Sequence, residues 1–419
     1  MKRLMAGMMV LAASLSITTT ALATNGYFQH GFGVNEQAMA GAGVALPQDS
    51  IDASTNPANM VFLGTRYDFG LAFFNPNRQY TVSGAPSGAP GTFGLAPGTV
   101  KSSKDWFVIP SLGGNWMLNP ESSAGISIFG NGGMNTEYNS PTFGVSPTGV
   151  DLSQLFVAAT YARKIASNYA IGITPIFAYQ KFEAKGLQAF SAFSSDPNNL
   201  TNNGHDNSYG YGARIGYQGE IIPHYVNLGL SYQTRIRMSK FHDYQGLFAQ
   251  AGDFDIPSTW TVGVAYKAVP SLTFLVDVQR INYSEIHSVH NPLLPNLGIY
   301  KLGMDGGAGF GWNDMTIVKL GVQWKSSEAW TWRVGYSKGN QPIPDSQVLF
   351  NILAPGVIEQ HVSVGFTTAV TKSQDFNFAL TRALSHSVSG PNPLEVPGQQ
   401  TIELKMDQWE IALGYAWKF

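Results

Sequence analysis

Residues 408–419, QWEIALGYAWKF, end the chain and alternate between large apolar and small or polar side chains. In a β-strand, successive side chains point to opposite faces of the sheet. One face here carries Trp409, Ile411, Leu413, Tyr415, Trp417 and Phe419, and the other carries Gln408, Glu410, Ala412, Gly414, Ala416 and Lys418. The first set suits lipid and the second suits a lumen. The stretch therefore predicts a transmembrane β-strand.

The same alternation recurs at 226–232, 260–266, 330–336 and 361–366, often with Trp or Tyr at the ends of the apolar face, as at a membrane interface. Fourteen strands are predicted, at 66–75, 104–118, 122–130, 152–166, 168–184, 206–219, 223–238, 257–267, 270–284, 314–326, 328–339, 357–371, 373–386 and 404–419. Short turns alternate with long connections such as 76–103 and 131–151, which is typical of periplasmic turns and extracellular loops. We expect an all-β fold, a fourteen-stranded antiparallel transmembrane β-barrel over 64–419.

The composition agrees with a barrel. Charged residues make up 12% of the chain and cysteine is absent, whereas soluble domains carry about 25% charged residues. The net charge of −2 gives no indication of a nucleic-acid partner. Lys2 and Arg3, an apolar stretch over 4–17, and the Ala21-Leu22-Ala23 site predict a cleaved signal peptide at 1–23. No later segment is apolar over the about 20 residues that a membrane helix needs.

Residues 24–63 lack strand alternation and are rich in Gly and Ala. Fourteen strands enclose a lumen that needs filling if the pore is not to leak. We therefore expect this segment to form a small N-terminal plug, or hatch, inside the barrel. It ends in Asn56, Pro57 and Ala58, where Pro57 restrains the backbone of Asn56 to extended conformations. This turn is either a latch with a free amide, set against a kinked wall strand, or a plain turn before the first strand.

Several short stretches occur together in a specific order. They are TNGYF at 24–28, GAGVA at 41–45, NPA at 56–58, IPSTW at 256–260 and GYS at 335–337 followed by QPIPD at 341–345. With the plug, the fourteen strands and the terminal Phe419, they resemble the long-chain fatty acid transporter family (FadL) and its related aromatic-hydrocarbon transporters. The resemblance covers essentially the whole mature chain.

The resemblance implies passive uptake of hydrophobic molecules across the outer membrane of a Gram-negative bacterium. Extracellular loops would capture the ligand, the plug would rearrange, and the ligand would leave sideways at a kink in the third strand. It implies a monomer without cofactor or metal, surrounded by outer-membrane lipid and lipopolysaccharide. Phe419 resembles the signal by which the barrel-assembly machinery recognises its substrates.

Three groups of candidate site residues follow from the resemblance and from strand alternation. The lateral opening is assigned to Gly130, Asn131, Gly132 and Gly133, which could instead begin an extracellular loop. The capture loops offer Leu187, Phe190, Phe193, Leu247, Phe248 and Phe254, which could instead pack against one another. Lumen-facing candidates for a carboxylate are Arg214, Arg235, Arg237, Lys319 and Arg333, which could instead pair with acidic neighbours.

The ligand is thus either a long-chain fatty acid or an uncharged aromatic or aliphatic hydrocarbon. An enzyme is not indicated, because the histidines are scattered and the chain has no Gly-x-Ser-x-Gly motif. His287 and His290 form a pair without a nearby third metal ligand. An open hydrophilic porin would have no plug, and an additional adhesin role is not addressed by the sequence.

Overall fold

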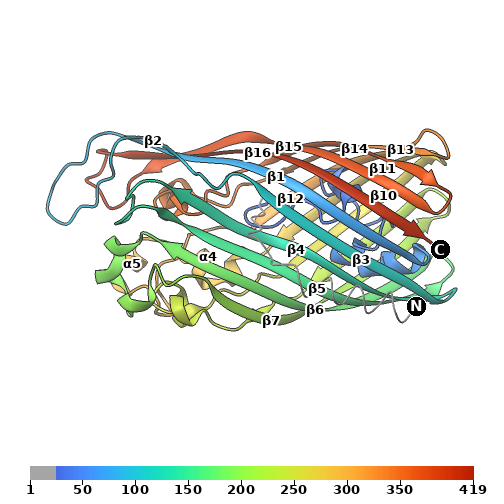
Figure 1. Cartoon of the computed structure of the whole chain (residues 1–419), viewed down its shortest axis with the longest axis horizontal. Helices are drawn as coiled ribbons and strands as arrows, with labels where there is room; N and C mark the ends of the chain where they lie inside the picture. Colours follow the sequence, from blue (N-terminus) through green and yellow to red (C-terminus); the bar gives the residue numbers. More distant parts are fainter. Residues whose placement is uncertain (1–24) are drawn as a thin grey trace.

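The computed structural model describes residues 25–419 and shows a closed β-barrel (Figure 1). The predicted signal peptide at 1–23 lies outside the described residues. The wall strands are β1 (Arg66–Ser83), β3 (Phe107–Asn119), β4 (Ser122–Tyr138), β5 (Thr148–Ala166), β6 (Tyr169–Lys185), β7 (Asp206–Ile222), β8 (Val226–Gln233), β10 (Thr259–Val269), β11 (Leu272–Ile281), β12 (Met315–Lys325), β13 (Trp330–Gly339), β14 (Gln360–Thr371), β15 (Gln374–Pro391) and β16 (Thr401–Lys418). The short strands β2 (Gly98–Lys101) and β9 (Arg237–Met238) pair with β1 and β7.

Closure of the sheet satisfies most of the backbone groups in the wall. β16 pairs with β1 from Arg66–Lys418 to Ser83–Thr401, and every other wall strand is antiparallel to its neighbours. A closed barrel has no open edge, as a lipid environment requires. The predicted fourteen-stranded antiparallel barrel is therefore confirmed. No helix within residues 25–419 has the length and apolarity needed to traverse a bilayer.

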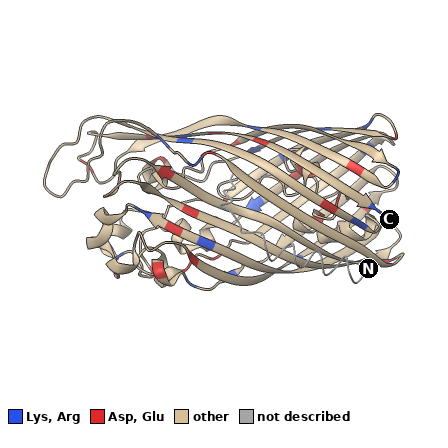
Figure 2. Cartoon of the chain, viewed as in Figure 1, with Lys and Arg blue, Asp and Glu red and all other residues tan. Residues whose placement is uncertain are grey.

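The alternation in the last strand also has the predicted sense. Trp409 and Ile411 are 45% and 43% exposed, whereas Gln408 and Ala412 are each 1% exposed. The apolar set thus faces outward and the small or polar set faces the lumen. Charged residues are sparse along the wall (Figure 2), which matches the low charged fraction of the sequence.

Several strands are longer than predicted at their extracellular ends. β1 continues to Ser83 instead of ending at 75, β15 continues to Pro391, and β4 continues to Tyr138. The predicted loop 131–151 therefore consists largely of strand. The reason is physical: beyond the bilayer the outer face meets water, so the apolar alternation that marks a strand in lipid is lost while the backbone pairing continues.

Short helices and loops cover the extracellular end, opposite the C-terminus (Figure 1). They are η3 (Gln188–Phe193), η4 (Pro197–Asn199), η5 (His242–Tyr244), α3 (Ala249–Gly252), η6 (Tyr283–Glu285), α4 (His287–His290), α5 (Asn296–Ile299), η7 (Asp345–Gln347) and η8 (Phe350–Ile352). Their apolar side chains join one large buried cluster that continues into the barrel.

Residues 25–63 lie inside the barrel and contain α2 (Val34–Gln37), η1 (Asp52–Ser54) and η2 (Pro57–Phe62). Wall side chains hold the segment by its backbone. The Asp277 carboxylate accepts hydrogen bonds from the N–H groups of Gly43 and Val44, at 2.7 and 3.0 Å. Lys319 donates to the carbonyls of His30 and Gly41, at 3.0 and 3.1 Å. Bonds to backbone groups fix the position of a segment that has little regular structure of its own.

Candidate functional site

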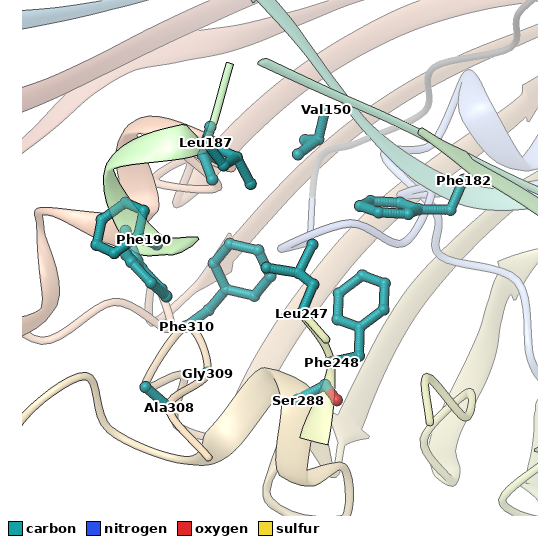
Figure 3. A pocket seen from close by; sticks show the side chains of 12 residues that line it. Val150, Phe182, Leu187, Phe190, Leu247, Phe248, Ser288, Ala308, Gly309 and Phe310 are labelled. Atoms are coloured by element: carbon teal, nitrogen blue, oxygen red, sulfur yellow. The ribbon is translucent and has the colours of Figure 1, made fainter. Parts of the chain in front are cut away.

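An apolar cavity lies under the extracellular loops (Figure 3). Leu187, Phe190, Leu247 and Phe248 come from two of the loops predicted to capture ligand, and all four line it. Ser288 is the one lining residue with a polar side chain, and its hydroxyl already donates to the carbonyl of Asp253. The cavity measures about 20 Å³, room for about one water molecule. A ligand of any size must therefore push these side chains apart.

Four of the six predicted capture residues are buried, Leu247 is partly buried, and the set does not form an exposed groove. Leu187, Phe190 and Phe248 are 1–3% exposed, and Phe254 is fully buried beneath them. Phe193 alone is well exposed, at 45%, and does not line the cavity. The other residues follow the alternative considered above, in which they pack against one another. The helices and loops above them shield this cluster from water.

An aromatic column continues from the cavity towards the plug. Phe248 contacts Phe254 with ring centroids 4.8 Å apart, and Phe254 lies 6.1 Å from Tyr27 of the plug. Tyr283 holds this end of the plug, because its hydroxyl donates to the carbonyl of Asn25 at 2.6 Å and accepts from the N–H of Tyr27 at 3.2 Å. The sequence analysis did not assign a role to Tyr27, although it lies in the TNGYF stretch.

The wall has a window between β3 and β4. Their pairing stops at Leu112–Ile128, although β4 continues from Phe129 to Tyr138. In the described chain the window closes again at an isolated bridge between Ser102 and Tyr138. From the inside, the plug fills the gap in the hydrogen bonding.

The plug pairs with β4 inside this window. The N–H of Gln29 donates to the carbonyl of Asn131 at 3.0 Å, and the N–H of Gly133 donates to the carbonyl of Tyr27 at 2.9 Å. These two bonds replace those that β3 would make in a continuous wall. The plug segment therefore occupies the place of a missing strand at the window.

The four residues predicted for the lateral opening lie at a bulge in β4, not at the start of a loop. Gly130 pairs with Leu155 and Gly132 with Gln154, which leaves Asn131 as the extra residue. A bulge bends its strand and disrupts the ladder. Position 132 also requires glycine because the plug backbone approaches it closely. A Cβ there would lie 1.9 Å from the carbonyl oxygen of Tyr27.

Arg78 lies beside the window in a cavity of about 10 Å³ that Met134 and Trp312 also line. It is 5% exposed, one terminal nitrogen donates to the carbonyl of Lys104 at 2.6 Å, and its Cζ lies 5.6 Å from the centre of the Phe107 ring. Its Nε has no hydrogen-bond partner among the described residues. Within residues 25–419 it forms no ion pair. A buried cation with an unsatisfied donor is costly, and an anionic ligand would satisfy it. Arg78 was not predicted as a site residue, because the first strand was predicted to end at 75.

Four of the predicted carboxylate residues already make hydrogen bonds or ion pairs, although the Nε of Arg214, like that of Arg78, has no partner among the described residues. Lys319 binds plug carbonyls as described, Arg214 donates to Gln233, Arg235 pairs with Asp255 at 2.8 Å, and Arg333 donates to Gln323 and Thr367.

The fifth prediction, that Arg237 faces the lumen, is wrong. Arg237 is exposed and pairs in register with Tyr211, which is 74% exposed. The chain leaves the ladder between β8 and β9, and this break shifts the alternation.

The Asn56-Pro57-Ala58 turn is held by the wall. The Asn56 amide donates to the carbonyl of Tyr217 on β7 at 2.9 Å and to that of Val44 at 2.8 Å. A latch against the kinked third strand was expected, but the turn instead lies against β6 and β7. The register explains this position, because Gly172 and Gly216 are paired there and lack the Cβ atoms that would meet Pro57 and Asn56.

Burial shifts the ionisation of two plug residues. It raises the pKa of Asp49 to about 7, with Asp68 adding to the effect. Burial, together with the charge of Lys319, lowers the pKa of His30 to about 3. Both groups therefore favour their neutral forms inside the barrel.

Together, these features define the class as a plugged transmembrane barrel with an extracellular apolar cavity and a window in its wall. Residues 15–419 match the family model described as outer membrane protein transport protein (OMPP1/FadL/TodX). The chain belongs to this family, whose members transport hydrophobic molecules and lie in the outer membrane as single-chain barrels. A comparison with curated protein sequences gives no match.

Solved structures of similar fold include three from this group. The Pseudomonas putida toluene transporter TodX has a TM-score of 0.68 and 16% identity, over 93% of this chain and 99% of that one. A Pseudomonas aeruginosa FadL homologue has a TM-score of 0.70 and 14% identity, over 94% and 100%. The Ralstonia pickettii toluene transporter TbuX has a TM-score of 0.62 and 16% identity, over 93% and 99%. At these identities the likeness concerns the fold.

Proposed function

We propose that this outer-membrane transporter takes up long-chain fatty acids. One observation carries the choice of ligand: Arg78 is buried, forms no ion pair among the described residues, and lies between the aromatic column and the wall window. A fatty acid carboxylate would give its guanidinium a charge-assisted partner. An uncharged ligand would leave the Nε of this guanidinium without a partner among the described residues, with the Lys104 carbonyl and the Phe107 ring, 5.6 Å from its Cζ, as its contacts.

The route begins at the extracellular cavity. An alkyl chain enters it by displacing the packed side chains, among them Leu247 and Phe248, and then follows the aromatic column to Tyr27. The segment from Tyr27 to Gln29 then leaves β4, which opens the window beside Arg78. The ligand passes sideways into the membrane, so that its alkyl chain never crosses the polar lumen.

A second candidate ligand is an uncharged aromatic hydrocarbon. The extracellular cavity favours it, because aromatic rings dominate its lining and its one lining hydroxyl, of Ser288, is already bonded. Aromatic pairs have preferred geometries that add to the effect of burying their area. In this alternative, Arg78 would serve only to fix the local structure.

Uptake assays separate the two candidates. The chain would be expressed in a bacterium that lacks its own fatty acid transporter, and uptake of labelled oleate and of toluene would be measured. We expect oleate uptake, with a loss of about tenfold or more in Arg78→Gln, which removes a charge-assisted bond. Arg382→Gln is the control, because Arg382 pairs with Asp407 on the outward face of the wall, whereas Arg78 points inward. Toluene uptake without oleate uptake, from a correctly inserted barrel, would contradict the fatty acid proposal.

The same proposal includes the route to the membrane. Export would use a signal peptide at 1–23 that is cleaved after Ala23, and assembly would use the machinery that recognises Phe419. Phe419 is 80% exposed at the end of the last strand, which leaves it accessible. The barrel would work as a monomer surrounded by outer-membrane lipid and lipopolysaccharide.

A further inference from the structure

The lipid-facing wall is hollowed on the side of the barrel where the plug latch lies. A groove of about 810 Å³ crosses β5, β6, β7, β8 and β10. Its volume falls within the range of about 300–1,000 Å³ that is usual for sites of small organic ligands. The groove is far larger than the closed cavity under the loops, and it opens outward, where the bilayer lies.

The strand register explains the shape of the groove. One row across five strands consists of Tyr161, Ile173, Ile215, Tyr232 and Trp260. All five side chains point outward and are 37–52% exposed. The aromatic residues stand at the two ends of the row and the isoleucines in the middle, so that the floor is lower than the rims. An apolar floor between rigid aromatic walls suits an alkyl chain.

A cation lines the same groove. Arg163 lies on β5 three residues before the strand ends at Ala166, and its side chain is exposed. Its partner in the register is Ile171, so it lies on the outward face with the isoleucines. In the part of the chain that is described, it forms no ion pair. An outward arginine near the membrane surface is stable when it reaches lipid headgroups.

The position in the membrane identifies the occupant. β5 and β6 are joined by a short turn at 167–168, at the end of the barrel that carries the C-terminus. The short turns mark the periplasmic side, where the leaflet of the outer membrane consists of glycerophospholipids. We propose that the groove is a binding site for one glycerophospholipid of this leaflet, with an acyl chain over Ile173 and Ile215 and the phosphate on Arg163. The guanidinium can donate two parallel bonds to a phosphate.

The inner face of the same wall carries the latch. Gly172 and Gly216, which also line the groove, are the residues against which Pro57 and Asn56 pack. A lipid chain outside and the plug turn inside would therefore contact the two faces of one thin patch of sheet. This arrangement gives the lipid a structural role, because it covers a patch that lacks inward side chains.

Native mass spectrometry of the purified full chain tests the site. The barrel would be released from its membrane in mild detergent and titrated with phosphatidylglycerol. We expect one phospholipid per barrel to be retained. Ile215→Trp should fill the groove and abolish this retention, and Arg163→Gln should lower the affinity by about tenfold or more, as expected for the loss of a charge-assisted bond.

Matched controls keep the test specific. Val364→Trp places the same bulk on an outward position of β14 that is 46% exposed, and Lys325→Gln removes an exposed cation near the end of β12. Both should bind as the unchanged chain does. Equal binding by Ile215→Trp and Val364→Trp would overturn the site. Oleate bound as tightly as phospholipid, with no effect of Arg163→Gln, would overturn the assignment of the phosphate to Arg163.

Discussion

The side-chain amide of Asn56 donates a hydrogen bond to the backbone carbonyl of Tyr217 over 2.9 Å, and this bond joins the plug to β7. The same amide donates to Val44 within the plug, so that one side chain fixes both the fold of the plug and its position. The N-terminal end is fixed separately, by the pairing of Tyr27 and Gln29 with β4. These two attachments lie on different walls of the barrel, beside the contacts that Asp277, Lys319 and Tyr283 make with the plug, and only the second covers the window. We therefore expect the N-terminal end to move while the latch stays in place.

Loss of the latch should loosen the whole plug. Asn56→Ala removes the bonds to Tyr217 and Val44 and should cost about 1–3 kcal/mol of plug docking, because buried partners are left unsatisfied. Hydrogen exchange at residues 25–63 would measure the effect as faster exchange. Asn59→Ala is the control, since the buried Asn59 amide has no hydrogen-bond partner within residues 25–419. Equal acceleration in both variants would show that the latch has no special role.

Plug docking should depend on pH through Asp49. Its folded pKa of about 7 lies above its ordinary value of about 3.9, so that the folded state binds more protons between these two values. The contribution of Asp49 is therefore most favourable at low pH and is lost as pH rises towards 7. His30, with a pKa of about 3, contributes in the opposite sense below about 6.5.

Comparing the wild-type chain with Asp49→Asn separates the effect of Asp49 from that of His30. We expect the free energy of unfolding of the wild-type chain, relative to that of Asp49→Asn, to fall between pH 4 and pH 7 and then to level off. Urea unfolding in detergent micelles at several pH values would measure it. Parallel pH profiles for the two proteins would contradict the assignment.

A charge in the extracellular cavity should prevent capture. Leu247→Asp places a carboxylate among Phe248, Phe310 and their neighbours, where it is desolvated and repels a fatty acid. Binding of a fluorescent fatty acid to the purified barrel should weaken by about tenfold or more. Ile299→Asp on α5 is the matched control, because Ile299 is 65% exposed and does not line the cavity. Similar binding by both variants would show that capture takes place elsewhere.

The alternation in the sequence predicts the barrel because lipid imposes it. Trp409 and Ile411 face outward in β16 as predicted, since a strand in lipid must present apolar side chains on every second residue. Outside the bilayer this constraint ends. For this reason the extension of β1 to Ser83 was not predicted, and Arg78 appeared to lie in a loop.

The site depends on contacts between distant segments, which a pattern in one segment cannot predict. The bulge at Asn131 follows from local glycines, but the pairing of β4 with Tyr27 and Gln29 joins residues about a hundred positions apart. Likewise, the phenylalanines in the loops predicted an exposed capture site. Their burial was not predicted, because it depends on the other loops that lie above them. Arg237 was assigned to the wrong face of the wall, because one break in a strand reverses the orientation of every later side chain.

In the proposed function, the ligand leaves through the window between β3 and β4 when the plug segment moves. Phe32 of the plug and Phe129 at the start of the window have ring centroids 5.1 Å apart. Because the chain has no cysteine, Phe32→Cys with Phe129→Cys provides one pair of thiols for a short, reducible cross-linker. The single variants, treated with the same reagent, serve as controls.

Oleate uptake in cells that carry this double variant is the most direct measurement. We predict that cross-linking abolishes uptake, that a reducing agent restores it, and that the single variants are unaffected. Uptake that continues at the same rate with the plug locked to β4 would contradict lateral release through this window.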